Sequence, residues 1–136
     1  MRSVQAAPLA TIADDDSEVS TPGSVAATQV AADLFEDLVC NNYVHRVTRH
    51  LVDLRDGCRV LGAEVVAASG LQVPDGVAVS RDRRWVAISN HLTHSVAIYD
   101  RVQRLAPDAS PTGVLCNVNH PHGLAFQRRR WPSRRG

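Results

Sequence analysis

The sequence contains no lysine, few aromatic residues and no long apolar run. All 15 of its basic residues are arginine, a bias typical of GC-rich coding DNA. Two Trp, two Tyr and two Phe are the only aromatic residues within an apolar share of 44%, so the 136-residue chain suits one domain with a thin core. No stretch approaches the ~18 apolar residues of a membrane span, and the apolar stretch after Arg2 is too weak for a secretory signal. We therefore expect a cytoplasmic chain with no membrane partner.

Cysteine is also scarce. Cys40, Cys58 and Cys116 are odd in number, widely spaced and never in a C-x-x-C pair, which predicts neither a disulfide framework nor a zinc knuckle. Each has apolar neighbours, so we expect small buried residues in strands. A G-x-S-x-G elbow, a Walker loop, a Rossmann fingerprint and an H-E-x-x-H helix are all missing. The sequence therefore indicates no catalytic residue.

The net charge of +1 gives the chain no field that would attract nucleic acid, so a nucleic-acid partner is not expected. The charges are unevenly distributed, because an acidic run at residues 14–16 contrasts with five arginines among the last nine residues. Ser, Thr, Pro and Gly surround the acidic run, which favours a solvated arm.

The pattern of apolar residues changes along the chain. Residues 1–24 show no periodicity and predict a flexible leader. After them, apolar residues recur at spacings of three and four with acidic residues largely opposite, which predicts a short amphipathic helix over residues 25–37. A strand-rich region over residues 38–126 and a basic tail over residues 127–136 follow.

In the strand-rich region apolar residues alternate with a period of two. Val77–Ser80, Trp85–Asn90 and Ser95–Tyr99 are short β-branched and aromatic runs separated by tight polar turns, which predicts a three-stranded meander. Leu38–Asn41 is expected to be an earlier strand, and Gly113–Val118 supplies a fourth strand to the meander.

The strand pattern repeats. Asn41–Val47 aligns with Asn90–Val96 at a shift of 49 residues, and Pro74–Val79 aligns with Pro121–Phe126 at a shift of 47. A unit of about 50 residues with four short strands is typical of a β-propeller blade. The sequence therefore predicts an all-β fold, an incomplete β-propeller with about two four-stranded antiparallel blades.

Residues 74–100, and the segment PHGLAF that begins at Pro121, resemble the repeats of NHL-type and YVTN-type β-propellers. In that lactonase-like superfamily a Pro-x-Gly opening leads into the innermost strand, a polar turn follows, and the third strand ends near Tyr-Asp. Proline fixes the approach to the strand, and glycine lets backbones crowd together. One departure is Arg83, where the family's turn usually has glycine, so we expect a looser hairpin there.

The resemblance also implies where a ligand would bind. In complete members the residue between Pro and Gly sits at the mouth of the central channel, where ligands or metals bind. This makes Asp75 and His122 candidate ligand-binding residues, with Asn90 and His91 on a nearby turn. The alternative is that Asp75 caps a turn and His122 is a solvated loop residue.

Six histidines raise the question of a metal site. His91-x-x-His94 and His120-x-His122 could each chelate an ion if their side chains shared a face. A proline interrupts the second pair, however, and neither pair has a carboxylate or cysteine at ligand spacing. We therefore expect no metal and no other cofactor in this chain, because a divalent metal would need a complete propeller. His45 and His94, which match across the repeat, are expected to satisfy turn backbone groups.

Two functions remain open. The first is part of a β-propeller protein that acts as a non-catalytic scaffold and binds an unidentified small molecule or protein. The second is a lactonase-like hydrolase of the sugar-lactone class, implied by the resemblance, whose remaining blades are missing or supplied by oligomerisation. Two blades leave sheet edges open, so self-association through those edges is also expected.

The last residues break the repeat. A polar turn and a strand resembling Trp85–Asn90 should follow Phe126, but residues 127–136 contain a proline and five arginines. We expect this tail to be the product of a truncation or reading-frame change. The alternative is a basic tail that binds phosphate or an acidic surface.

Overall fold

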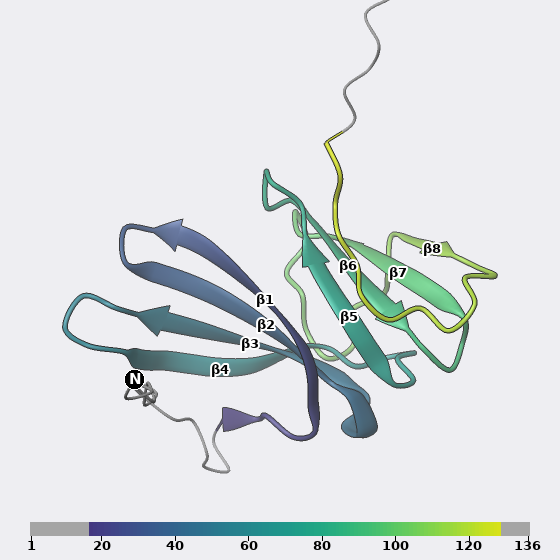
Figure 1. Cartoon of the computed structure of the whole chain (residues 1–136), viewed down its shortest axis with the longest axis horizontal. Coiled ribbons are helices and arrows are strands. Elements are labelled where there is room, and N and C mark those ends of the chain that lie inside the picture. The colour runs from purple at the N-terminus through teal and green to yellow at the C-terminus, as the bar shows by residue number, and fades with distance from the viewer. Residues whose placement is uncertain (1–16, 129–136) are drawn as a thin grey trace, which may run out of the picture.

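The computed structural model describes residues 17–128 as two four-stranded antiparallel sheets (Figure 1). Each sheet is a meander in which strands adjacent in sequence pair, in the orders β1-β2-β3-β4 and β5-β6-β7-β8. The all-β prediction is confirmed, and residues 17–128 contain no α-helix and no helix able to cross a membrane. The strands are β1 (Pro22–Ala31), β2 (Leu34–Asn41), β3 (Arg46–Asp53), β4 (Arg59–Ala67), β5 (Pro74–Val79), β6 (Trp85–Asn90), β7 (Ser95–Asp100) and β8 (Gly113–Leu115).

The helix predicted over residues 25–37 is wrong, because this segment forms β1 and the start of β2. Exposed and half-buried residues alternate along β1, as they do on a strand with one covered face. Asp33 adopts a left-handed backbone (φ 56°) in the turn between the two strands. Two strands joined by a tight turn can place apolar residues three or four apart at the turn, which imitates a helical pattern.

The first sheet therefore begins at Pro22 and not at residue 38, so the leader predicted over residues 1–24 overlaps β1. Its residues 1–16, like residues 129–136 of the basic tail, lie outside the described part of the chain.

The remaining strand predictions are largely confirmed. Leu38–Asn41 lies at the end of β2, the strands at Trp85–Asn90 and Ser95–Tyr99 are present as β6 and β7, and Val77–Val79 belongs to β5. The fourth strand, β8, is shorter than expected and ends at Leu115.

The core lies between the two sheets, where β1 and β2 of the first sheet lie against β5 of the second. Leu38 and Cys40 from the first sheet join Ile88 and Tyr99 from the second in one buried cluster. Burial raises the pKa of the Cys40 thiol to about 12. The expectation that all three cysteines are buried in strands is wrong for Cys58, which is half-buried before β4, and for Cys116, which is exposed after β8.

A buried ion pair also joins the sheets. Glu36 of β2 is almost fully buried, and its Oε2 accepts hydrogen bonds from Arg49 Nε at 2.6 Å and from Arg101 Nη2 at 2.7 Å. Burial by itself raises the pKa of the Glu36 carboxyl, but the hydrogen bonds from Arg101 and Arg49 outweigh it and hold this pKa below its ordinary value. Arg101 follows β7, so this carboxylate ties the second sheet to the first.

After β8 the chain returns across the second sheet (Figure 1). Residues 121–126 run over the face formed by Ala78, Ala87 and Ile98, and Leu124 and Phe126 line a space of about 180 Å³ there. In register, Ala87 of β6 corresponds to Leu38 of β2, which faces the second sheet. The returning segment thus covers the Ala87 face of the second sheet, and β5 covers the matching Leu38 face of the first sheet.

Candidate functional site

The same loop geometry occurs three times at one end of the two sheets. Thr21, Val73 and His120 each precede a proline and each adopt a left-handed backbone, with φ of 50°, 55° and 41°. This conformation is uncommon for residues other than glycine, and it is least favourable for the β-branched residues Thr21 and Val73. The backbone at His120 therefore has the conformation that precedes β1 and β5, although residues 121–126 form no strand.

Two histidines hold these loops in place. His45 Nδ1 accepts a hydrogen bond from the Val73 amide at 3.0 Å, and His94 Nδ1 accepts one from the His120 amide at 3.2 Å. Each donor is thus a residue with a left-handed backbone, and each acceptor lies in the preceding unit. The prediction that His45 and His94 satisfy turn backbone groups is confirmed.

The asparagines at the ends of β2 and β6 are structural in the same way. Asn41 Oδ1 accepts from the Ser20 amide at 2.7 Å, and Asn90 Oδ1 accepts from the Gln72 amide at 2.5 Å. Asn90 Nδ2 also donates to the Gly70 carbonyl at 3.0 Å, and the residue is 4% exposed. Asn90, a predicted ligand-binding residue, therefore has its side chain buried in the loop that leads into β5.

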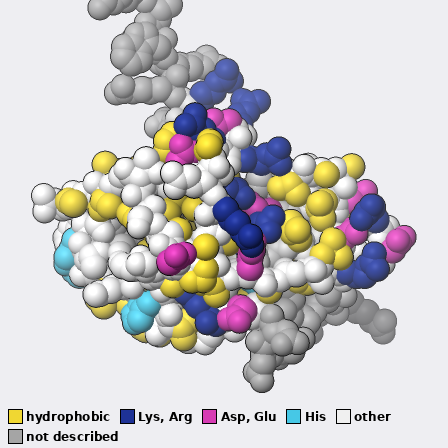
Figure 2. Space-filling view, turned by 180° about the vertical axis from the view of Figure 1, so that it is seen from behind, with side chains coloured by type: hydrophobic (Ala, Val, Ile, Leu, Met, Phe, Trp, Pro, Cys, Tyr) yellow, Lys and Arg dark blue, Asp and Glu magenta, His cyan; other side chains and the backbone are white. Residues whose placement is uncertain are grey.

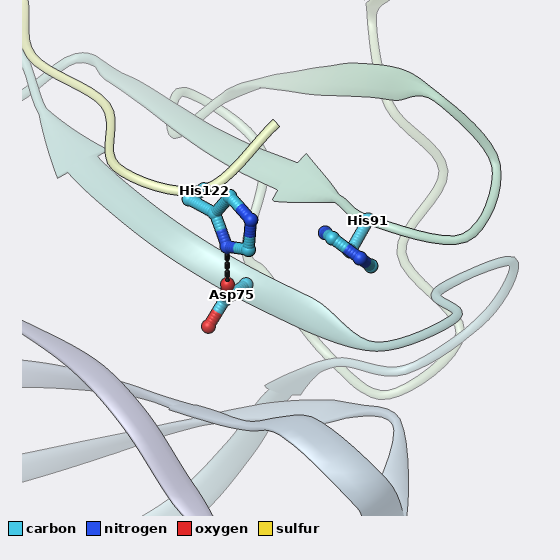
Figure 3. A group of neighbouring side chains, drawn as sticks. All are labelled: Asp75, His91 and His122. Carbon is cyan, nitrogen blue, oxygen red and sulfur yellow. Dashed lines mark hydrogen bonds and ion pairs between the residues drawn. The ribbon is translucent and has the colours of Figure 1, made fainter. Parts of the chain in front are cut away.

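The other three predicted ligand-binding residues meet at this end of the second sheet (Figure 3). Asp75 lies in β5, His91 directly after β6, and His122 in the returning segment, and one ligand atom from each lies within 4.8 Å of the others. Asp75 Oδ2 contacts His122 Nδ1. The side chain of Asp75 is 21% exposed and that of His122 is 66% exposed, so the cluster opens to solvent.

Asn42 orients the carboxylate from the first sheet, a contact that the sequence analysis missed. It lies in η2 (Asn42–Val44), and its Nδ2 donates to Asp75 Oδ1 at 3.0 Å. Burial raises the pKa of Asp75, but the hydrogen bonds from His122 and Asn42 dominate and lower this pKa below its ordinary value. Asp75 is therefore a carboxylate at neutral pH, with one oxygen held by Asn42 and the other toward His122.

Four histidine rings contact one another in a row that begins beside this carboxylate. The ring of His91 lies 4.6 Å from that of His122 and 4.8 Å from that of His120, and the ring of His120 lies 4.3 Å from that of His94. Desolvation lowers the pKa of His120, and the nearby His94, His91 and His122 lower it further. His91 Nδ1 is buried and has no hydrogen-bond partner within residues 17–128.

Glycine is required where the returning segment approaches β5. A Cβ atom added to Gly76 would lie 1.8 Å from the His122 carbonyl oxygen. The Ser89 hydroxyl bridges the two, because it accepts from the Gly76 amide at 2.6 Å and donates to that carbonyl at 2.7 Å. This close approach sets the position of His122 over Asp75 and agrees with the role expected for the Pro-x-Gly glycine.

Comparison of the chain with protein-family models, curated proteins and solved structures found no match.

Proposed function

We propose that the chain is a non-catalytic interaction scaffold of the β-propeller type, which consists of two blades and a segment, residues 121–126, in the position of the first strand of a third. The main support is the repetition of face and loop. The β5 strand covers one face of the first sheet, and residues 121–126 cover the matched face of the second sheet. Matched histidines and asparagines fix the loops at which successive units begin.

The surface that this scaffold offers is the partly covered face of the second sheet. Leu124, Ala125 and Phe126 cover this face only in part, and a space of about 180 Å³ lies between them and Ala78, Ala87 and Ile98. Leu115 on the edge strand β8 is 55% exposed and Phe126 is 44% exposed. On the face of the molecule shown in Figure 2, hydrophobic side chains form separate groups, with charged side chains gathered near the middle. An exposed edge strand beside apolar side chains favours strand or sheet partners.

The partner proposed for this face is another copy of the chain. The matched face of the first sheet is covered by the second sheet of the same chain. A sheet of this sequence is therefore known to fit such a face. The outward face of the first sheet, where Val25 is 61% exposed, would supply that sheet. Such a head-to-tail contact is heterologous, and it closes into a ring when the rotation per copy allows.

The test is the mass in solution across a dilution series, measured by size-exclusion chromatography with light scattering. We expect species that are multiples of the 14.8 kDa chain and that dissociate on dilution. Leu115→Asp should give a monomer, because it places a charge on the open edge. Val102→Asp, at a loop position that is 76% exposed, is the matched control and should assemble like the wild type. A wild-type monomer at every concentration would overturn the proposal.

A hydrolase of the sugar-lactone class is the second candidate, and one contact favours it. The Asp75 carboxylate contacts His122 Nδ1, which leaves Nε2 to take a proton from a water that attacks a lactone carbonyl. Hydrolysis of glucono-δ-lactone, followed by proton release, tests this function. Activity above the uncatalysed rate that disappears in His122→Gln would support the hydrolase, and a rate equal to that of buffer would exclude this substrate.

A further inference from the structure

We propose that Asp75, His91 and His122 form a binding site for Zn²⁺ or a similar borderline divalent metal ion. The three residues come from three separate segments, and each presents a ligand atom within 4.8 Å of the other two (Figure 3). Two imidazole nitrogens and one carboxylate oxygen are a ligand set that zinc uses, with a fourth position for water. Imidazole ligands favour Zn²⁺ over Mg²⁺ and Ca²⁺, which take oxygen ligands.

Two further features prepare the three residues for a cation. Asn42 donates to Asp75 Oδ1 at 3.0 Å and so fixes the carboxylate from outside, as the second shell of a metal site does. His91 Nδ1 is buried without a hydrogen-bond partner among the described residues, and burying a polar atom in this way carries a free-energy cost.

The surrounding charges also suit an added cation. Asp75 supplies the carboxylate of the cluster, and its negative charge would offset that of a bound cation. The ring of His120 borders the cluster at 4.8 Å from that of His91.

A bound ion would join β5, the turn after β6 and the returning segment at one point. The described contacts of His122 with the second sheet are its carbonyl bond from Ser89 and its side-chain contact with Asp75. Metal binding therefore has a structural readout besides affinity, because the ion would protect the backbone of residues 118–126 from hydrogen exchange. This inference does not depend on assembly. A monomer that binds zinc would support the metal site and contradict the proposed ring, and a ring that binds no zinc would contradict only the metal site.

The experiment is calorimetric titration of the EDTA-treated, dialysed full chain with ZnCl₂, with MgCl₂ and CaCl₂ as separate probes. We expect one Zn²⁺ per chain, no measurable Mg²⁺ or Ca²⁺, and increased protection of residues 118–126. His91→Gln, His122→Gln and Asp75→Asn should each weaken zinc binding by more than about 10-fold, and Asn42→Ala by about 10-fold. Cys58→Ser removes a potential zinc ligand outside the cluster, between β3 and β4, and it should bind zinc like the wild type.

A spectroscopic gain keeps the proposal testable where a variant is damaged. Asp75→Cys should retain Co²⁺ binding and add a thiolate-to-cobalt charge-transfer band that the wild type lacks. Absence of this band in a variant that remains folded by circular dichroism would overturn the assignment. So would zinc affinity that is unchanged in Asp75→Asn and His122→Gln, or a loss in Cys58→Ser as large as theirs.

Discussion

Substituting Gly76 by alanine should release the returning segment while leaving the second sheet folded. The new Cβ would lie 1.8 Å from the His122 carbonyl oxygen and 2.9 Å from both the His122 carbonyl carbon and the Ser89 hydroxyl. Gly76 does not have a left-handed backbone, so alanine suits its conformation and the contact with residue 122 is the source of the strain.

The magnitude follows from these distances. The His122 carbonyl must retreat by roughly 1.2 Å to reach the 3.0 Å that real Cβ contacts tolerate, which breaks the bond from Ser89 Oγ. Overpacking of this kind costs about 1–3 kcal/mol, and the lost hydrogen bond about 1 kcal/mol. Because residues 121–126 lack the ladder bonds of a strand, a cost of this size is comparable to the free energy that holds them in place.

Hydrogen exchange followed by mass spectrometry measures this directly. In Gly76→Ala the peptides that cover residues 118–126 should exchange about 10-fold faster or more, since each 1.4 kcal/mol changes the opening equilibrium tenfold. Peptides from β6 and β7 should keep their wild-type rates. Gly123→Ala is the matched control, because it lies in the same segment and its Cβ would meet nothing within 4 Å. Unchanged exchange at residues 118–126 in Gly76→Ala, or equal acceleration in Gly123→Ala, would refute this reasoning.

Three further predictions concern stability. Arg83→Gly should raise the free energy of unfolding in urea by about 0.5–1 kcal/mol, because Arg83 has a left-handed backbone (φ 61°) that glycine adopts without strain; a loss would show that its side chain matters more. Glu36→Gln should cost about 2–3 kcal/mol at neutral pH. Since the folded-state pKa of Glu36 is lowered, that difference should shrink as the pH falls below the ordinary value of 4.5 through the folded-state value, and a pH-independent difference would contradict the pairing with Arg101. Asn90→Ala should cost about 2–3 kcal/mol in thermal or urea unfolding, because it leaves a buried amide and carbonyl unpaired, and its matched variant Asn41→Ala should cost a similar amount.

The repeat in the sequence predicted more of the site than any single motif did. Aligning Pro74–Val79 with Pro121–Phe126 put Asp75 and His122 in matched positions, and the structure brings them into contact. The alignment of Asn41–Val47 with Asn90–Val96 paired His45 with His94, which make matched hydrogen bonds. Repeats predict contacts well because each unit must fit the next in the same way.

Local spacing did not reveal which carboxylate lies beside the histidines. His91-x-x-His94 and His120-x-His122 had no nearby carboxylate in sequence, but the structure supplies Asp75 from 47 residues before His122. Separation along the chain says little about distance in a fold whose strands return repeatedly to one end.

Two features were beyond the sequence for other reasons. Residues 25–37 carry apolar spacings that a helix and a tight hairpin share, so the choice between them depends on pairing with β3 and the rest of the sheet. The bridge from Glu36 to Arg101 joins residues 65 apart that no motif links. It could be found only from the packing of the two sheets.

The hydrogen bond from the His120 amide to His94 Nδ1 has a consequence for protein engineering. Each unit supplies the histidine Nδ1 that accepts a hydrogen bond from the residue that leads into the next unit, so the units are joined in one direction along the chain. The acceptor for a following unit is already in place. Residues 74–120 make up one complete unit. It starts at the proline that follows Val73 and ends at His120, whose amide donates the next histidine hydrogen bond. Inserting copies of this 47-residue cassette between His120 and Pro121 would place every junction in an environment that the chain already contains. Arrays of increasing length could be made in this way. The free energy that each added unit contributes would then be the difference in free energy of unfolding between successive arrays.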